Sequence, residues 1–220
     1  MCNRMVRSSE SAAICARFSV RTRPLPAIST SWNVRPRDAL PVIRQGENRR
    51  RELAFLKWGL ELDHHALSTV DGVIVAVTAL ELRRAALLQD LFSTNRCIVP
   101  ADAFYAGPPQ HARGGHHWAF ALDDSGIMGV AAMWLPHADG TDRCAIITTG
   151  PNESLALVDE RMPAILYRED ERAWLTPSSN PYAAYNLIMP YPAEMMRGWP
   201  VAKARESSLL DGPELLRRVA

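Results

Sequence analysis

The chain has 220 residues, of which 47% are hydrophobic, so it is long and apolar enough for one large globular domain or two small ones. Its formal net charge of +1 excludes a strong overall basic field, and leaves any binding of nucleic acid to local clusters of charge. No apolar run approaches the roughly 20 residues of a membrane-spanning helix, and the N-terminus has no signal-peptide pattern. We therefore expect no membrane association.

Arginine clusters come first along the chain. They lie at 17–23, at 49–51 and at 83–84. Taken singly, each cluster is typical of a solvated surface. Taken together, the clusters allow an alternative, in which they form one basic face built from the first half of the chain.

Short apolar segments bounded by turn residues fill the middle of the chain. They predict strands at 73–77, 97–99, 117–122, 129–134 and 144–149. Apolar spacing predicts a helix over 80–92, and two shorter helices are expected at 153–157 and 213–219, the last with Asp211 as a possible cap. These elements predict an α+β fold with a single domain over 1–220. Its centre would be a mainly antiparallel curved sheet or barrel, with peripheral helices.

The cysteines are spread over positions 2, 15, 97 and 144 without a CxxC pair. This spacing favours reduced thiols in a cytoplasmic protein over a disulfide framework. No metal-ligand spacing and no phosphate-binding glycine-rich loop is present, so we expect no metal and no cofactor.

Cys2, directly after the initiator Met1, is the most informative residue. Removal of Met1 would leave an α-amine and a thiol on the same residue. Such an aminothiol can condense with an aldehyde to form a five-membered thiazolidine, or it can act as an N-terminal nucleophile. The alternative is an ordinary surface cysteine.

Ordered blocks along nearly the whole chain resemble the SOS response-associated peptidase (SRAP) family, whose members bind single-stranded DNA and cross-link to abasic sites. The most specific block is Arg-Cys-Ile-Val-Pro-Ala-Asp-Ala-Phe-Tyr at 96–105, and the first is Met-Cys-Asn-Arg at 1–4. Further blocks lie at 31–36, 40–43, 58–60, 131–134, 147–163 and 199–201.

Three departures from the family pattern concern proton transfer and polar contacts. Ala106 stands where the resemblance implies a Glu, and Asp159 stands where it implies a His. The family's Asn and Arg are absent from the segment 77–82. A positioned Glu or His typically accelerates such a reaction by ~100 to 10,000-fold, and an exposed Asp with a pKa near ~3.9 is a weak base at neutral pH. These departures predict a slow or differently assisted reaction.

The resemblance implies Cys2 as the nucleophile, with Asp159 in the position of the catalytic His. It implies contacts to single-stranded DNA from Arg4, Asn33, Pro36, Trp58, Thr149 and Arg161. Of these residues, we expect Cys2, Asn33, Thr149, Asp159 and Arg161 to converge on one groove. Trp58 has core packing as its alternative, and Arg161 has pairing with Asp102 or Asp159.

The function implied is capture of abasic sites in single-stranded DNA through Cys2, as a covalent DNA–protein cross-link in the DNA-damage response. Self-removal of Met1 would make the chain a thiol-dependent self-processing peptidase. The first alternative is a degenerate relative that binds single-stranded DNA without covalent chemistry. The second is an unrelated thiol hydrolase. The sequence identifies no protein partner.

Overall fold

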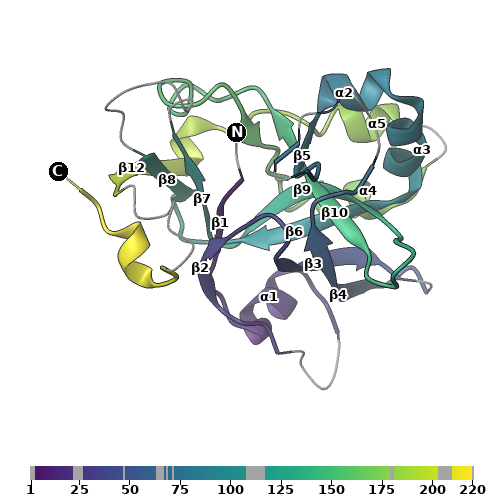
Figure 1. Cartoon of the computed structure of the whole chain (residues 1–220), viewed down its shortest axis with the longest axis horizontal. Coiled ribbons are helices and arrows are strands. Elements are labelled where there is room, and N and C mark those ends of the chain that lie inside the picture. Colours follow the sequence, from purple (N-terminus) through teal and green to yellow (C-terminus); the bar gives the residue numbers. More distant parts are fainter. Residues whose placement is uncertain are drawn as a thin grey trace.

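Two β-sheets form the centre of the molecule in a computed structural model that describes residues 3–21, 27–46, 48–62, 67, 69–70, 72–107, 117–178, 181–202 and 210–219. The first sheet, sheet A, has five strands whose pairings are all antiparallel. Figure 1 shows it on the left. Its order is β12 (Met196–Val201), β8 (His117–Leu122), β7 (Ala103–Ala106), β1 (Met5–Arg7) and β2 (Ser31–Val34).

The second sheet, sheet B, is larger and strongly curved. Its order is β11 (Met162–Pro163), β10 (Arg143–Thr149), β4 (Arg51–Trp58), β3 (Ala39–Gln45), β6 (Arg96–Ala101) and β9 (Met128–Leu135), while β5 (Ala76–Thr78) pairs with β10. Only the pairings of β10 with β4 and β5 are parallel. β9 also pairs with β10, so the sheet curls round, but β4 meets β10 over only two residue pairs. The predicted α+β fold is confirmed, with a curved sheet and no closed barrel.

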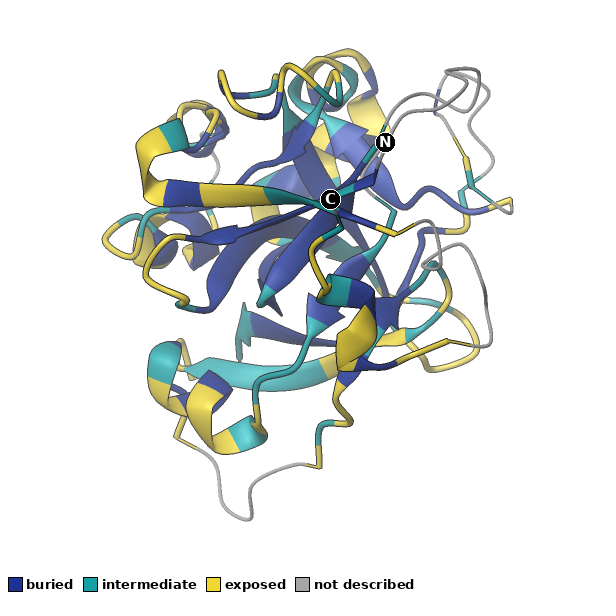
Figure 2. Ribbon diagram, turned by 90° about the vertical axis from the view of Figure 1, so that its left-hand side faces the viewer, coloured by how far each residue is buried: buried dark blue, intermediate teal, exposed yellow. Residues whose placement is uncertain are grey.

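Short helices lie around the sheets, as Figures 1 and 2 show. They are α1 (Ser11–Arg17), α2 (Ala79–Arg84), α3 (Ala86–Thr94), α4 (Glu171–Leu175), α5 (Tyr182–Tyr185) and the 3-10 helices η1 (Ala193–Met195) and η3 (Pro213–Leu216). Within the described residues, no helix is long and apolar enough to cross a membrane.

Strands β6, β9 and β10 of sheet B are buried on both faces, which explains their continuous apolar runs, whereas β4 is only partly buried. In β6, Cys97 and Val99 face one hydrophobic cluster, which lies between the two sheets, while Ile98 faces a second cluster beneath the helices. A third, smaller cluster on the other face of sheet A includes Tyr105 and Leu215. The main core thus joins the two sheets into one domain.

The predicted strands agree closely with the structure. The segment 117–122 is β8 without change, and 97–99, 129–134 and 144–149 lie inside β6, β9 and β10. The segment 73–77 is less regular, since Val73 and Ile74 form isolated bridges before β5 begins at Ala76.

The predicted helices are less accurate. The helix expected over 80–92 is interrupted at Ala85, whose extended backbone separates α2 from α3. In one continuous helix, Leu82 and Leu88 would point about 120° apart, because each residue turns by about 100°. The break lets both side chains reach the core with 0% exposure. The helix expected at 153–157 is a series of turns.

The C-terminal segment is also different from the expectation. Only 213–216 is helical, as η3, and Asp211 does not cap it. The Asp211 carboxylate instead accepts hydrogen bonds from the backbone N–H groups of Trp32 and Asn33, at 2.5 and 3.0 Å. Further on, Arg218 forms a bridge with Val201 of β12. The segment therefore contacts both edge strands of sheet A.

Candidate functional site

The first strand sets the position of the N-terminal segment. β1 lies between β7 and β2, and its Met5 is opposite Phe104 of β7. Continuing this antiparallel register by two residues brings Asn3 opposite Ala106. Cys2 lies outside the described residues.

The far end of β1 is held by Asp102. Its carboxylate accepts hydrogen bonds from the backbone N–H groups of Ser8 and Ser9, at 2.6 and 2.9 Å, and from the Ser9 hydroxyl. Asp102 is therefore a partner of the turn before α1, so the alternative pairing of Asp102 with Arg161 is not found. Nothing in the sequence indicated this contact, because Ser9 and Asp102 are 93 residues apart.

Ala106, which stands where the resemblance implies a Glu, ends β7 and is 2% exposed. It lies opposite Trp118 of β8 on one side and, by register, opposite Asn3 on the other. A methyl group at this position cannot transfer a proton. The geometry thus places the missing acid–base group next to the start of the chain.

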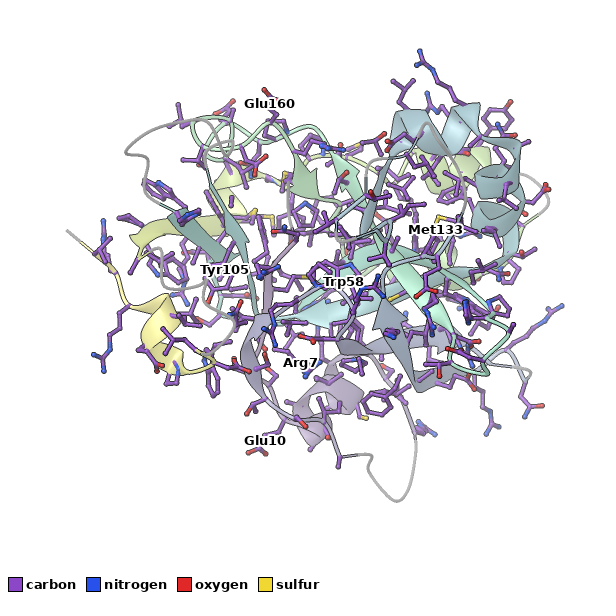
Figure 3. All side chains as sticks on the ribbon, in the orientation of Figure 1. Arg7, Glu10, Trp58, Tyr105, Met133 and Glu160 are labelled. Carbon is purple, nitrogen blue, oxygen red and sulfur yellow. The ribbon has the colours of Figure 1, made fainter. Side chains whose placement is uncertain are left out.

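Three of the expected site residues come together at the end of β10. Thr149 pairs with Met162 of β11, and Arg161 directly precedes that strand. The Asp159 Oδ1 atom accepts a hydrogen bond from the Arg161 backbone N–H at 3.3 Å. All three site residues are half-buried. Met162 belongs to the same hydrophobic cluster as Met5 and Ala106. Glu160, between Asp159 and Arg161, is labelled at the surface in Figure 3.

Two of the residues expected to contact DNA are buried in this structure. Trp58 is 0% exposed, and its indole N–H donates to the Val75 carbonyl at 2.9 Å. Figure 3 shows Trp58 in the middle of the molecule. No ring face is available for a base to stack on, so Trp58 is a core residue, the alternative stated for it above. Asn33 is 3% exposed, and its amide donates to the Leu210 carbonyl at 3.1 Å, so it contacts the C-terminal segment.

Arg4 and Pro36 remain at the surface. Both are half-buried: Arg4 immediately before β1 and Pro36 in the turn after β2. The Arg4 guanidinium donates to the Asn3 carbonyl at 2.9 Å. Because β1 and β2 pair through Met5 and Val34, these two residues lie at the same end of their strands.

The cysteines in the described part of the chain are unsuited to nucleophilic chemistry. Cys15, Cys97 and Cys144 are all buried and have free thiols. Burial raises the pKa of the Cys144 thiol to about 12, and it raises the pKa of Cys97 well above its usual value. Burial also raises the pKa of Cys15. Since the thiolate is the reactive form, Cys2 is the remaining candidate nucleophile. No cluster of metal-ligating side chains occurs among the residues described.

The fold and the ordered sequence blocks define a family. A model described as SOS response associated peptidase (SRAP) matches residues 1–207, and the chain belongs to this family. It is 29% identical to the abasic site processing protein YoqW of Bacillus subtilis over 98% of this chain and 99% of that protein. It is 28% identical to the abasic site processing protein YoaM of the same organism, over 98% of this chain and 97% of that protein.

Solved structures share the fold. A protein from Bacteroides thetaiotaomicron superposes with a TM-score of 0.82 at 20% identity, covering 100% of both chains. A phage-related protein from Bordetella bronchiseptica superposes with a TM-score of 0.72 at 18% identity, covering 92% of this chain and 95% of that one.

Proposed function

We propose that this protein binds single-stranded DNA and captures abasic sites through Cys2, forming a covalent DNA–protein cross-link after removal of Met1. Membership of the SRAP family and the names of the Bacillus subtilis relatives support the substrate. The observation that carries the proposal is the pairing of β1 with β7, because its register brings Asn3, the neighbour of Cys2 in the sequence, beside position 106.

The chemistry would begin with hydrolysis of the Met1–Cys2 peptide bond, which frees the α-amine of Cys2. The amine adds to the aldehyde of a ring-opened abasic deoxyribose, and water leaves as the Schiff base forms. The Cys2 sulfur then adds to the imine carbon while its proton passes to the nitrogen, which closes the thiazolidine. An α-amine has a pKa of ~7.7 to 8.0 and a thiol ~8.5, so reactive forms of both exist at neutral pH.

Around this centre we propose Arg4 and Arg161 as phosphate contacts, with Pro36 and Thr149 beside the strand. Asp159 stands where the family's His is expected, and its carboxylate already accepts the Arg161 backbone N–H. Both the small side chain at 106 and the carboxylate at 159 favour slow capture. The three free, buried thiols suit a reducing compartment, which supports a cytoplasmic location.

A second candidate is non-covalent binding of single-stranded DNA. Ala106 specifically favours it, because its 2% exposed methyl group leaves no proton donor at the position where one is expected.

Incubation with abasic single-stranded DNA followed by denaturing electrophoresis tests the proposal. The wild type should form a stable cross-link, Cys2→Ala should form none, and Cys2→Ser should give at most a reducible Schiff base, since a hydroxyl closes the ring poorly. Intact mass should show loss of Met1. If Met1 is absent and the wild type behaves like Cys2→Ala, non-covalent binding is the better account.

A further inference from the structure

A second concentration of charge lies away from the N-terminal segment. A pocket of about 640 Å³ opens between the end of α1, the β3–β4 hairpin and α4. Its charged lining consists of Arg17, Arg49, Arg51, Arg168, Arg172 and Glu171. We call it the arginine pocket. The sequence indicated two of its arginine clusters but not that they meet.

Glu171 holds two of these arginines in place. Its side chain is only 2% exposed, and its two carboxylate oxygens lie 2.7 Å from an Arg17 nitrogen and 3.0 Å from an Arg51 nitrogen. Arg51 also donates to the Phe18 carbonyl at 3.0 Å, and the Arg17 guanidinium lies over the Phe18 ring. These contacts fix two guanidinium groups before any ligand binds.

The pocket has more positive charge than this pairing requires. Neither Arg49 nor Arg172 has an ion-pair partner among the described residues, and both are exposed. Arg168 reaches Asp124 at 3.8 Å, but both side chains are 63% exposed, so water screens the pair. Arg17 is 10% exposed, and its buried Nε atom has no hydrogen-bond partner within the part of the chain described. Clustered like charges that lack counterions form a site for an anion.

The lining indicates which anion. Guanidinium groups match phosphate through paired N–H donors, whereas the lining has no aromatic ring on which a base could stack. Two lining residues, Ser19 and Arg49, have left-handed backbone with φ of 55°, which is uncommon outside glycine and concentrates at functional sites.

The neighbouring cavity limits where the anion can lie. That cavity, of about 460 Å³, shares Arg17 and Arg168 with the arginine pocket. It is also lined by four carboxylate side chains, those of Asp123, Asp124, Glu169 and Glu194. Their negative charge confines an anionic ligand to the arginine pocket.

We propose that the arginine pocket binds a phosphate group, supplied by a small polyphosphate ligand or by a nucleic-acid backbone. The pocket is separate from the start of β1, since α1, which lines the pocket, follows the far end of that strand. Figures 1 and 2 both show α1 at the bottom of the molecule, below the sheets. The proposal does not depend on abasic-site capture.

Titration calorimetry with inorganic pyrophosphate and an undamaged single-stranded oligonucleotide tests it. The test variant is Arg49→Ala with Arg172→Ala, since both side chains are exposed and neither makes an ion pair or a side-chain hydrogen bond within the described part of the chain. The matched control is Arg84→Ala, which removes an exposed arginine from α2, outside the pocket.

For pyrophosphate, we expect saturable binding that weakens about tenfold or more in the double variant and is unchanged in the control. For the oligonucleotide, loss of two phosphate contacts should flatten the log–log salt slope by roughly 1.4. A pyrophosphate effect alone supports a small ligand, and a slope change supports a nucleic acid. If the double variant matches the control with both probes, the proposal is wrong, whatever the result of the cross-linking assay.

Discussion

The N-terminal segment and the arginine pocket differ in the reactive and charged side chains that they hold. The first has Cys2 and an alanine at position 106, but few basic side chains: Arg4 before β1 and Arg161 before β11. The second has five arginines around the buried Glu171, but no nucleophile.

The difference shows that charge and reactivity need not coincide. An aminothiol reacts without a strong electrostatic field, since both its groups have pKa values near neutrality. A phosphate, in contrast, is held almost entirely by charge and hydrogen bonds. Each region can therefore be changed while the other is measured.

The largest expected effect is on folding. Glu171→Gln removes the carboxylate that pairs with both Arg17 and Arg51, and we expect it to lower the free energy of unfolding by about 3 kcal/mol, as when one partner of a buried ion pair is lost. Denaturant unfolding measures this change. The control is Glu169→Gln, an exposed neighbour, which should alter stability by less than about 0.5 kcal/mol. Equal losses in the two variants would show that Glu171 does not organise the pocket.

Ala106→Glu tests the N-terminal side of the comparison. A Glu at this 2% exposed position would have its pKa raised by desolvation towards neutrality, where it can act as acid and base. We expect cross-linking to abasic single-stranded DNA to become about 100-fold faster. Quantified gel time courses measure the rate, and thermal unfolding checks the fold.

Ala106→Gln is the matched control, because it has the same shape without a titratable proton. The interpretation of position 106 fails if a folded Ala106→Glu variant is no faster than Ala106→Gln.

Trp58→Phe tests whether the Trp58 side chain packs in the core or stacks on a DNA base. The variant removes one of the two hydrogen bonds that the Val75 carbonyl accepts, the other coming from the Ile146 N–H at 3.1 Å. It also puts a smaller ring in a fully buried position, so it should lower stability by about 1–3 kcal/mol. Affinity for an undamaged single strand should be unchanged in fluorescence anisotropy, measured where the variant is fully folded. A folded variant that loses affinity without losing stability would restore the stacking role.

The smallest effect concerns the proposed phosphate contacts of Arg4 and Arg161. Arg161→Ala and Arg4→Ala should each flatten the log–log salt slope for single-stranded DNA by roughly 0.7. The wild type should bind single-stranded DNA with higher affinity than blunt duplex DNA. Arg84→Ala provides the baseline. An unchanged slope and affinity in both variants, with the fold intact, would exclude these residues from the interface.

The sequence predicts the inner strands well, because β8, β9 and β10 are apolar runs that end at turn residues such as Asp123 and Gly150. It fails at Ala85, where a helix-forming residue takes an extended backbone so that Leu82 and Leu88 can both be buried. Local propensity was overridden there by packing. The alternating strand β4 was missed within an arginine-rich stretch.

The candidate site was only partly predictable for similar reasons. The family blocks identify Thr149 and Arg161, and the structure brings them together at β10 and β11. They could not distinguish a stacking Trp58 from a buried one, because a tryptophan suits either environment. Nothing in the sequence indicated a role for Glu171, and only the fold shows that it meets arginines more than a hundred residues away.

The C-terminal segment over sheet A has a consequence for self-association. β2 and β12 are the outer strands of that sheet, and exposed outer strands are templates for pairing with another copy of the chain. Asp211 occupies two backbone donors of β2, and Arg218 bridges to Val201 of β12. This short stretch lies beyond the residues that match the family model, yet it blocks both routes to sheet extension. A protein shortened before Leu210 would therefore have two uncovered edge strands. It would be expected to aggregate before it lost any activity.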